Sequence, residues 1–123
     1  MNNADFLKAY NEGRNGANEF YRHSLVRNFN YSDGVKDCAD AGCHWLIDIA
    51  ATELPKVLQK KDENLGCFHI VVKLGKAKMN MTGSGDIELW HRNLDFTDMP
   101  EGTWTFYIGD DGDRYTMILP SEY

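Results

Sequence analysis

The period of the hydrophobic pattern changes at Gly66, and this change constrains the fold more than any other feature of the chain. Before it, residues 43–54 carry apolar side chains at the spacing of one helical face, among them Trp45 and Ile49. After it, residues 68–74 place an apolar side chain at every second position, which is the period of a β-strand. Helices followed by strands predict an α+β fold, in which the helices pack on one face of a sheet.

We expect a single domain over residues 1–123, a length that can bury a substantial core. Residues 1–62 are predicted to form a helical layer, and residues 66–120 an antiparallel meander of about five strands joined by short turns. The side chains expected between the two layers are Phe68, Ile70, Val72, Trp104, Phe106 and Met117 from the strands, with Trp45, Leu46 and Ile49 from the helices.

Two details of the helical layer also follow from the residues. Ser32 or Asp33 is the expected N-cap of a helix that runs through Val35, because a short polar side chain before an apolar run can accept a backbone hydrogen bond. Residues 17–25 are predicted to add a helical turn or two.

Composition and charge narrow the kind of function. No apolar run approaches the 18 or more residues of a membrane span, and the polar N-terminus lacks the regions of a secretory signal. The three cysteines are an odd number, which favours reduced thiols, so we expect the cytoplasm of a bacterial host cell. The net charge of −6 disfavours direct binding of nucleic acid, because acidic side chains repel phosphates.

Several polar residues in the first half are candidates for a cluster around Asp48, which is flanked by apolar residues in the most apolar helix. An unpaired buried carboxylate is costly, so a partner is expected. The cluster consists of Tyr21, Arg22, His23, Arg27, Asp33 and Asp48. One interpretation is a His23–Asp48 acid–base pair, and the other, which we favour, is a structural ion pair.

The sequence predicts neither a metal site nor a cofactor. The spacing of Cys38, Cys43 and His44, and that of Cys67 and His69, differs from the paired-cysteine patterns of zinc sites. Residues 110–113 contain three aspartates, but the residues after them do not continue a calcium-binding loop. No phosphate-binding loop or nucleophile elbow is present.

Four short segments resemble a family of phage and bacterial proteins known only as a domain of unknown function. They are Tyr21-Arg22-His23 with Leu25 and Arg27; Tyr31 to Val35; Gly42 with Trp45 to Ala50; and Leu119 to Tyr123. The resemblance implies an origin in phages or mobile elements, and it implies no activity.

The function we expect is therefore that of a small accessory protein that binds and inhibits a host protein or defence complex, for example an anti-CRISPR or another anti-defence factor. The alternatives are a small enzyme that uses His23, Asp48 and an arginine, or a structural phage protein. A homo-oligomer is compatible with the sequence. Residues 84–123 contain nine acidic and two basic side chains, which could steer a basic partner. The acidic residues expected to contribute to such a surface are Asp95, Asp98, Glu101, Asp110, Asp111 and Asp113.

Overall fold

The computed structural model describes residues 1–12 and 16–123 of the chain. The α-helices in these residues are α1 (Asn3–Asn11), α2 (Asp33–Asp40) and α3 (His44–Lys60). The strands are β1 (Phe20–Arg22), β2 (Phe29–Ser32), β3 (Leu65–Lys73), β4 (Lys76–Thr82), β5 (Glu88–Leu94), β6 (Gly102–Asp110) and β7 (Tyr115–Ile118). Two short 3-10 helices are η1 (Ser84–Asp86) and η2 (Pro120–Glu122).

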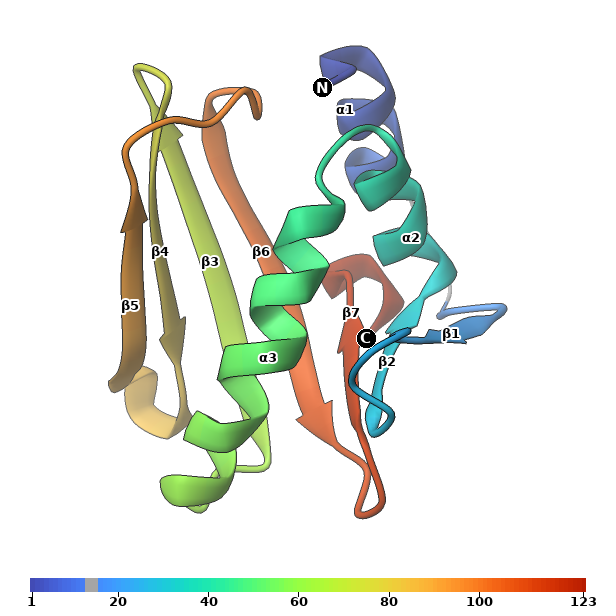
Figure 1. Cartoon of the computed structure of the whole chain (residues 1–123), viewed down its shortest axis with the longest axis vertical. Coiled ribbons are helices and arrows are strands. Elements are labelled where there is room, and N and C mark those ends of the chain that lie inside the picture. Colours follow the sequence, from blue (N-terminus) through green and yellow to red (C-terminus); the bar gives the residue numbers. More distant parts are fainter. Residues whose placement is uncertain (13–15) are drawn as a thin grey trace.

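The strands form one sheet, and the three α-helices lie on one face of it (Figure 1). The largest fully buried side chains come from both layers: Phe6, Phe29, Phe68, Phe106, Leu46, Leu54, Leu58, Ile70, Met79, Met81, Ile108 and Met117. In the part of the chain that the structure describes, no α-helix lies on the opposite face. We call this opposite side the bare face. It carries the alternate strand positions, such as Thr105 and Tyr107 on β6.

The spatial order of the strands is β1-β2-β7-β6-β3-β4-β5. Strands β3, β4 and β5 follow one another as antiparallel neighbours, and β6 then returns to pair with β3, which is a Greek-key arrangement. At the other side, β2 pairs with β7 in parallel, with Tyr31 opposite Met117. This parallel pair joins an N-terminal hairpin to the C-terminal strand.

The predicted α+β class, with helices on one face of a C-terminal sheet, is confirmed. Residues 65–118 form five antiparallel strands, as predicted, but in a Greek-key order and not as the predicted meander. Strands β1 and β2 enlarge the sheet, and the parallel β2–β7 pair makes it mixed. Residues 17–25 do not form a helical turn, because Phe20–Arg22 form β1 within the predicted helical layer. Strands of three and four residues are too short to show a clear period, and β2 depends on a partner strand more than 80 residues away.

The predicted core is largely confirmed. The six named strand residues and Leu46 are buried, whereas Trp45 and Ile49 lie at the margin and are partly exposed. Helix α3 continues through Pro55, which is itself buried, so the apolar face of this helix spans the sheet without a break. None of the helices in residues 1–12 and 16–123 is long and apolar enough to cross a membrane.

Candidate functional site

His23 joins the loop between β1 and β2 to helix α3 through a hydrogen bond with Asp48. His23 Nε2 lies 2.8 Å from Asp48 Oδ1. The other ring nitrogen, Nδ1, accepts hydrogen bonds from the backbone N–H groups of Leu25 and Val26, at 3.1 and 3.0 Å. Because Nδ1 acts as an acceptor, the ring proton is on Nε2, and a neutral His23 donates to the carboxylate of Asp48.

This geometry favours the structural interpretation of the pair over the acid–base interpretation. His23 is 5% exposed and both of its ring nitrogens are engaged, so neither is open to a substrate. Asp48, which was predicted as a charge inside an apolar helix, has a side chain that is 65% exposed. The carboxylate therefore keeps much of its hydration, and the buried member of the pair is the histidine.

Tyr21 and Asp33 lie on elements next to this pair. Tyr21, on β1, stacks on Tyr31 of β2 with ring centroids 5.9 Å apart. Asp33 begins α2, where its carboxylate accepts a hydrogen bond from the backbone N–H of Gly34 at 3.1 Å. Both residues stabilise the junction between the β1–β2 hairpin and α2.

Arg22 and Arg27 were predicted as possible partners of Asp48. Both are exposed, one at the end of β1 and the other in the loop that follows. Among the described residues, the ion-pair partner of Asp48 is His23 and neither of these arginines. The structure thus brings together two members of the predicted cluster and leaves the arginines at the surface.

Glu122 is a buried carboxylate that joins η2 to the start of α2. Its Oε1 accepts hydrogen bonds from the Ser32 hydroxyl at 2.5 Å and from the Leu119 N–H at 2.8 Å, and its Oε2 accepts from the Gly34 N–H at 3.2 Å. Ser32 Oγ accepts from the Val35 N–H at 3.2 Å, so Ser32 is the N-cap, which is one of the two residues predicted for this position. A Cβ on Gly34 would lie 2.6 Å from Glu122 Oε2, so a larger residue at this position would displace the carboxylate.

The four segments that carry the family resemblance meet in pairs. Tyr31 to Val35 meets Leu119 to Tyr123 through Glu122, and the segment around His23 meets the segment around Asp48. A carboxylate at the N-terminus of α2 is also favoured by the helix dipole. These segments therefore hold distant parts of the chain together.

The cysteines are unsuited to catalysis. Burial raises the pKa of the Cys43 thiol to about 12, and burial also raises the pKa of Cys67, so both remain protonated thiols near neutral pH. Nδ1 of His69, on the bare face, lies 3.0 Å from the hydroxyl oxygen of Thr105. In the described residues, no three histidine, cysteine, aspartate or glutamate side chains are arranged to hold a metal ion.

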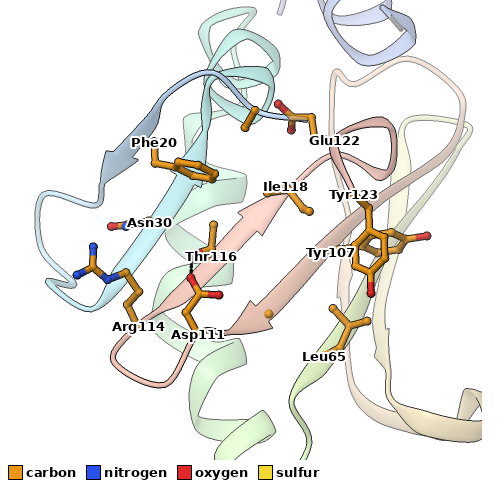
Figure 2. Close-up of a pocket in the computed structure, with 12 residues that line it drawn as sticks. Phe20, Asn30, Leu65, Tyr107, Asp111, Arg114, Thr116, Ile118, Glu122 and Tyr123 are labelled. Atoms are coloured by element: carbon orange, nitrogen blue, oxygen red, sulfur yellow. Dashed lines mark hydrogen bonds between the residues drawn. The ribbon is translucent and has the colours of Figure 1, made fainter. Parts of the chain in front are cut away.

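A groove of about 550 Å³ lies on the bare face, across the strands from β1 to β3 (Figure 2). Its larger apolar side chains are Phe20, Leu65, Tyr107, Ile118 and Tyr123, and we call it the aromatic groove. Figure 2 shows Phe20 projecting from β1 at one end and the rings of Tyr107 and Tyr123 together at the other. These two rings meet edge to face, with centroids 5.3 Å apart.

Polar groups occupy the rim of the aromatic groove. Asp111, in the β6–β7 hairpin, accepts a hydrogen bond from the Thr116 hydroxyl at 2.7 Å. Arg114 lies beside Asn30 in the part of the groove nearest to β2 (Figure 2). Glu122 also lines the groove, but its three donors come from the protein itself. The groove therefore offers an apolar floor and a polar rim, without an unpaired buried acid or base.

Sequence reasoning missed this groove, although one signal was present. Tyr107 and Ile118 are large side chains at strand positions that point away from the helices, where small or charged residues would be ordinary. They lie opposite each other in the β6–β7 pair. The contribution of Phe20 could not be anticipated, because residues 17–25 were predicted to be helical.

The six acidic residues predicted to bind a partner fall into two groups. Asp95, Asp98 and Glu101 lie in the loop before β6, whereas Asp110 ends β6 and Asp111 and Asp113 lie in the hairpin after it. The nine residues of β6 extend between Glu101 and Asp111, a distance of roughly 30 Å at about 3.3 Å per residue. The groups do not form one patch, and the hairpin group alone borders the aromatic groove through Asp111.

Comparisons with known proteins give a family match and a similar solved structure, and neither has an assigned function. A family described as a family of unknown function (DUF6876) matches residues 7–123. The structure is similar to a crystal structure of a protein of unknown function from Enterococcus faecalis, with a TM-score of 0.54 and 25% sequence identity, over 85% of this chain and 98% of that chain. No functionally curated protein matches the chain.

Proposed function

The chain belongs to the DUF6876 family of unknown function, and we propose that it acts by binding another protein through the bare face of its sheet. The observation that carries this proposal is the aromatic groove. The core is complete on the helix side, yet large apolar side chains gather on the opposite side of the same sheet. Phe20 is 54% exposed and Tyr123 is 78% exposed, although neither is needed to fill the core.

A gathering of exposed aromatic residues is typical of a binding surface. Tyrosine and phenylalanine are enriched at the centres of protein interfaces, where they bury a large area with few rotatable bonds. A hollow that is apolar at its floor and polar at its rim also has the anatomy of an interface. The volume of about 550 Å³ is large enough to accept one or two side chains of a partner.

The enzyme alternative has less support. A general base needs an accessible lone pair, and the described contacts engage both nitrogens of His23. The aromatic groove is lined by neither histidine nor cysteine in the described residues, and its buried carboxylate, Glu122, already accepts three hydrogen bonds. The groups that line the aromatic groove are suited to binding a partner and do not provide a general base or a nucleophile.

The finer proposal is that the partner is a host protein and that the chain inhibits it, as a phage or mobile-element accessory protein. The resemblance of the four segments to phage and bacterial proteins supports this origin. The small size and the net charge of −6 also suit a protein that blocks a basic surface of a larger one. An anti-CRISPR or another anti-defence factor is the specific form of this proposal.

Site-specific cross-linking tests the proposed surface. A photo-reactive phenylalanine analogue placed at position 107 is expected to cross-link a partner in host cells, and the same analogue at position 96 is the control. Phe96 is 79% exposed but lies at the far end of β6, outside the groove. The captured protein is then purified, and its binding is measured with Phe20→Ser and with Phe96→Ser.

Loss of binding in Phe20→Ser alone is the expected result, because Phe20 forms one end of the groove. Equal cross-linking from positions 107 and 96, or equal binding by the two serine variants, would contradict the proposal. Inhibition of the captured protein in its own assay would then test the finer proposal.

A further inference from the structure

The aromatic groove opens beside an accumulation of negative charge. Asp110, Asp111 and Asp113 lie at the tip of the β6–β7 hairpin, and Asp111 is part of the groove wall. Asp62 and Glu63, which follow α3, lie across a second hollow of about 280 Å³ from the same hairpin. Five carboxylates therefore surround one end of the sheet.

Arg114 belongs to the same hairpin and lines the groove together with Asp111, but the carboxylates at this end of the sheet outnumber it. The ion pairs among the described residues involve other acids, such as Asp40 with Lys36 and Glu53 with Arg92. In that part of the chain, no basic nitrogen lies within 4.0 Å of the five carboxylates. A net negative charge beside an apolar hollow attracts a ligand that combines positive charge with an apolar group.

The dimensions of the groove favour an extended segment. Its lining residues run over β1, β2, β7, β6 and β3, which are consecutive neighbours in the sheet. Four spacings of about 4.8 Å give a length of roughly 19 Å. An extended chain advances about 3.3 Å per residue, so roughly six residues cross the groove.

We propose that the aromatic groove binds a short extended peptide segment of the partner in which an aromatic side chain is flanked by lysine or arginine. The inference rests on the proposed function, because it names the chemistry of the partner at the same surface. The aromatic side chain lies between Phe20 and Tyr107, and the basic side chains lie toward the β6–β7 hairpin. Phe20 and Tyr107 provide the apolar contact, and the hairpin provides the charge.

Three synthetic peptides test the chemistry directly. The probe is an eight-residue peptide with blocked ends and a central tryptophan flanked on each side by two lysines. One control replaces the lysines with glutamates, and the other replaces the tryptophan with serine. Each peptide is titrated to millimolar concentration into the ¹⁵N-labelled protein at low salt. Only the probe is expected to shift the amide signals of Tyr107, Thr116 and Ile118, while Lys78 and Asn93 on the other side of the bare face stay unchanged.

Two triple variants with matched changes of charge separate the hairpin from the rest of the acidic surface. Changing Asp110, Asp111 and Asp113 to asparagine is expected to weaken binding of the probe by about tenfold, since each exposed charge pair contributes modestly. Asparagine keeps a side-chain oxygen, so the acceptors for Gly112 and Thr116 are retained. The control, Asp95→Asn, Asp98→Asn and Glu101→Gln, is expected to leave the affinity within about twofold, because those residues lie beyond β6.

Several outcomes would overturn the inference. They are equal binding of the glutamate peptide, binding that does not depend on the hairpin aspartates, shifts located outside the groove, and no binding of the probe. The cross-linking experiment decides the proposed function separately. If position 107 captures a partner while the probe fails, the surface is right and the basic aromatic segment is wrong.

Discussion

The two faces of the sheet use the same strands for different purposes. On β6, Trp104, Phe106 and Ile108 point toward the helices and are buried, whereas Thr105 and Tyr107 point to the bare face and are partly exposed. The helix-covered face is mainly apolar, as a core requires, with charged groups such as Arg92 and Glu53 at its margin. The bare face mixes polar and aromatic side chains, which a core does not require. We therefore expect stability to depend mainly on the helix-covered face, and the bare face carries the proposed binding surface.

The largest expected effect on stability compares Phe106 and Tyr107, two neighbouring residues that point to opposite faces of the sheet. Phe106→Ala removes a fully buried ring that contacts the aromatic core, and it should lower the free energy of unfolding by about 3–5 kcal/mol. Tyr107→Ala removes a partly exposed ring whose main aromatic contact is Tyr123, and it should cost only about 1 kcal/mol. Urea denaturation followed by circular dichroism measures both values.

Tyr107→Ala should also abolish the binding of the basic tryptophan peptide, although the variant remains folded. Equal destabilisation by the two substitutions would break the comparison, because it would place the bare face in the folding core.

The second effect concerns Glu122, which is both a wall of the groove and a buried hydrogen-bond acceptor. Glu122→Ala leaves the Ser32 hydroxyl and the N–H groups of Gly34 and Leu119 without their acceptor, and it should cost about 3 kcal/mol. The control is Glu101→Ala, since Glu101 accepts one exposed N–H group from Leu74 and should contribute less than about 1 kcal/mol. Thermal unfolding of the two variants provides the test.

Gly34→Ala tests the contact between Glu122 and the start of α2 without removing a hydrogen-bonding side chain. The added methyl group would lie 2.6 Å from Glu122 Oε2, so the carboxylate must move, at a cost of about 2 kcal/mol. An unchanged free energy of unfolding in Gly34→Ala would contradict the close packing of η2 against α2.

A third prediction compares the contributions of His23 and Asp48, the two partners of one hydrogen bond, to stability. His23→Ala removes the buried member and frees two backbone N–H groups, so we expect a loss of about 2 kcal/mol. Asp48→Ala removes the exposed member and should cost no more than about 1 kcal/mol. A double-mutant cycle in urea gives the coupling between them. A larger loss for Asp48→Ala than for His23→Ala would restore the original prediction of a buried charge.

The smallest effect is a pH dependence at the surface of α2. The hydrogen bond from Lys36 lowers the pKa of Asp40, with a further contribution from the charges of Lys36 and His44. A lowered pKa in the folded state means that the stabilisation is present above the unfolded pKa of about 4 and is lost as the pH falls through the folded value. Asp40→Asn should therefore lower the melting temperature slightly at pH 7 and leave it unchanged at about pH 2.

In a Lys36→Met background, the effect of Asp40→Asn at pH 7 should largely disappear, because the main cause of the lowered pKa is already removed. An Asp40→Asn effect that grows at low pH would have the wrong sign and would contradict the role of this pair.

Much of the architecture could be predicted from local patterns. The apolar spacing around Leu46 predicted α3, and the alternation from Phe68 onward predicted β3 and the strands after it. Ser32 or Asp33 was predicted as the N-cap of α2 because a polar side chain precedes an apolar run there, and the structure selects Ser32. These features depend on residues close together in the chain, so a single sequence contains enough information to place them.

The aromatic groove and the Glu122 contacts could not be predicted in the same way. Glu122 and Ser32 are 90 residues apart, and nothing near either residue specifies the other. Phe20 contributes to the groove only because β1 pairs with β2 and β2 pairs with β7. The acidic residues illustrate the same limit, since the acidic C-terminal third of the sequence contributes two separate groups at opposite ends of β6.

The sequence by itself determined the α+β class, the helix that covers the sheet and the alternation that divides each strand into two faces, because backbone geometry sets these periods locally. Only the tertiary structure decided the parallel β2–β7 pair, the burial of His23 with an exposed Asp48, and the groove beside the acidic hairpin. Those features depend on which strands become neighbours, and that choice is made by the packing of the whole core rather than by any one segment.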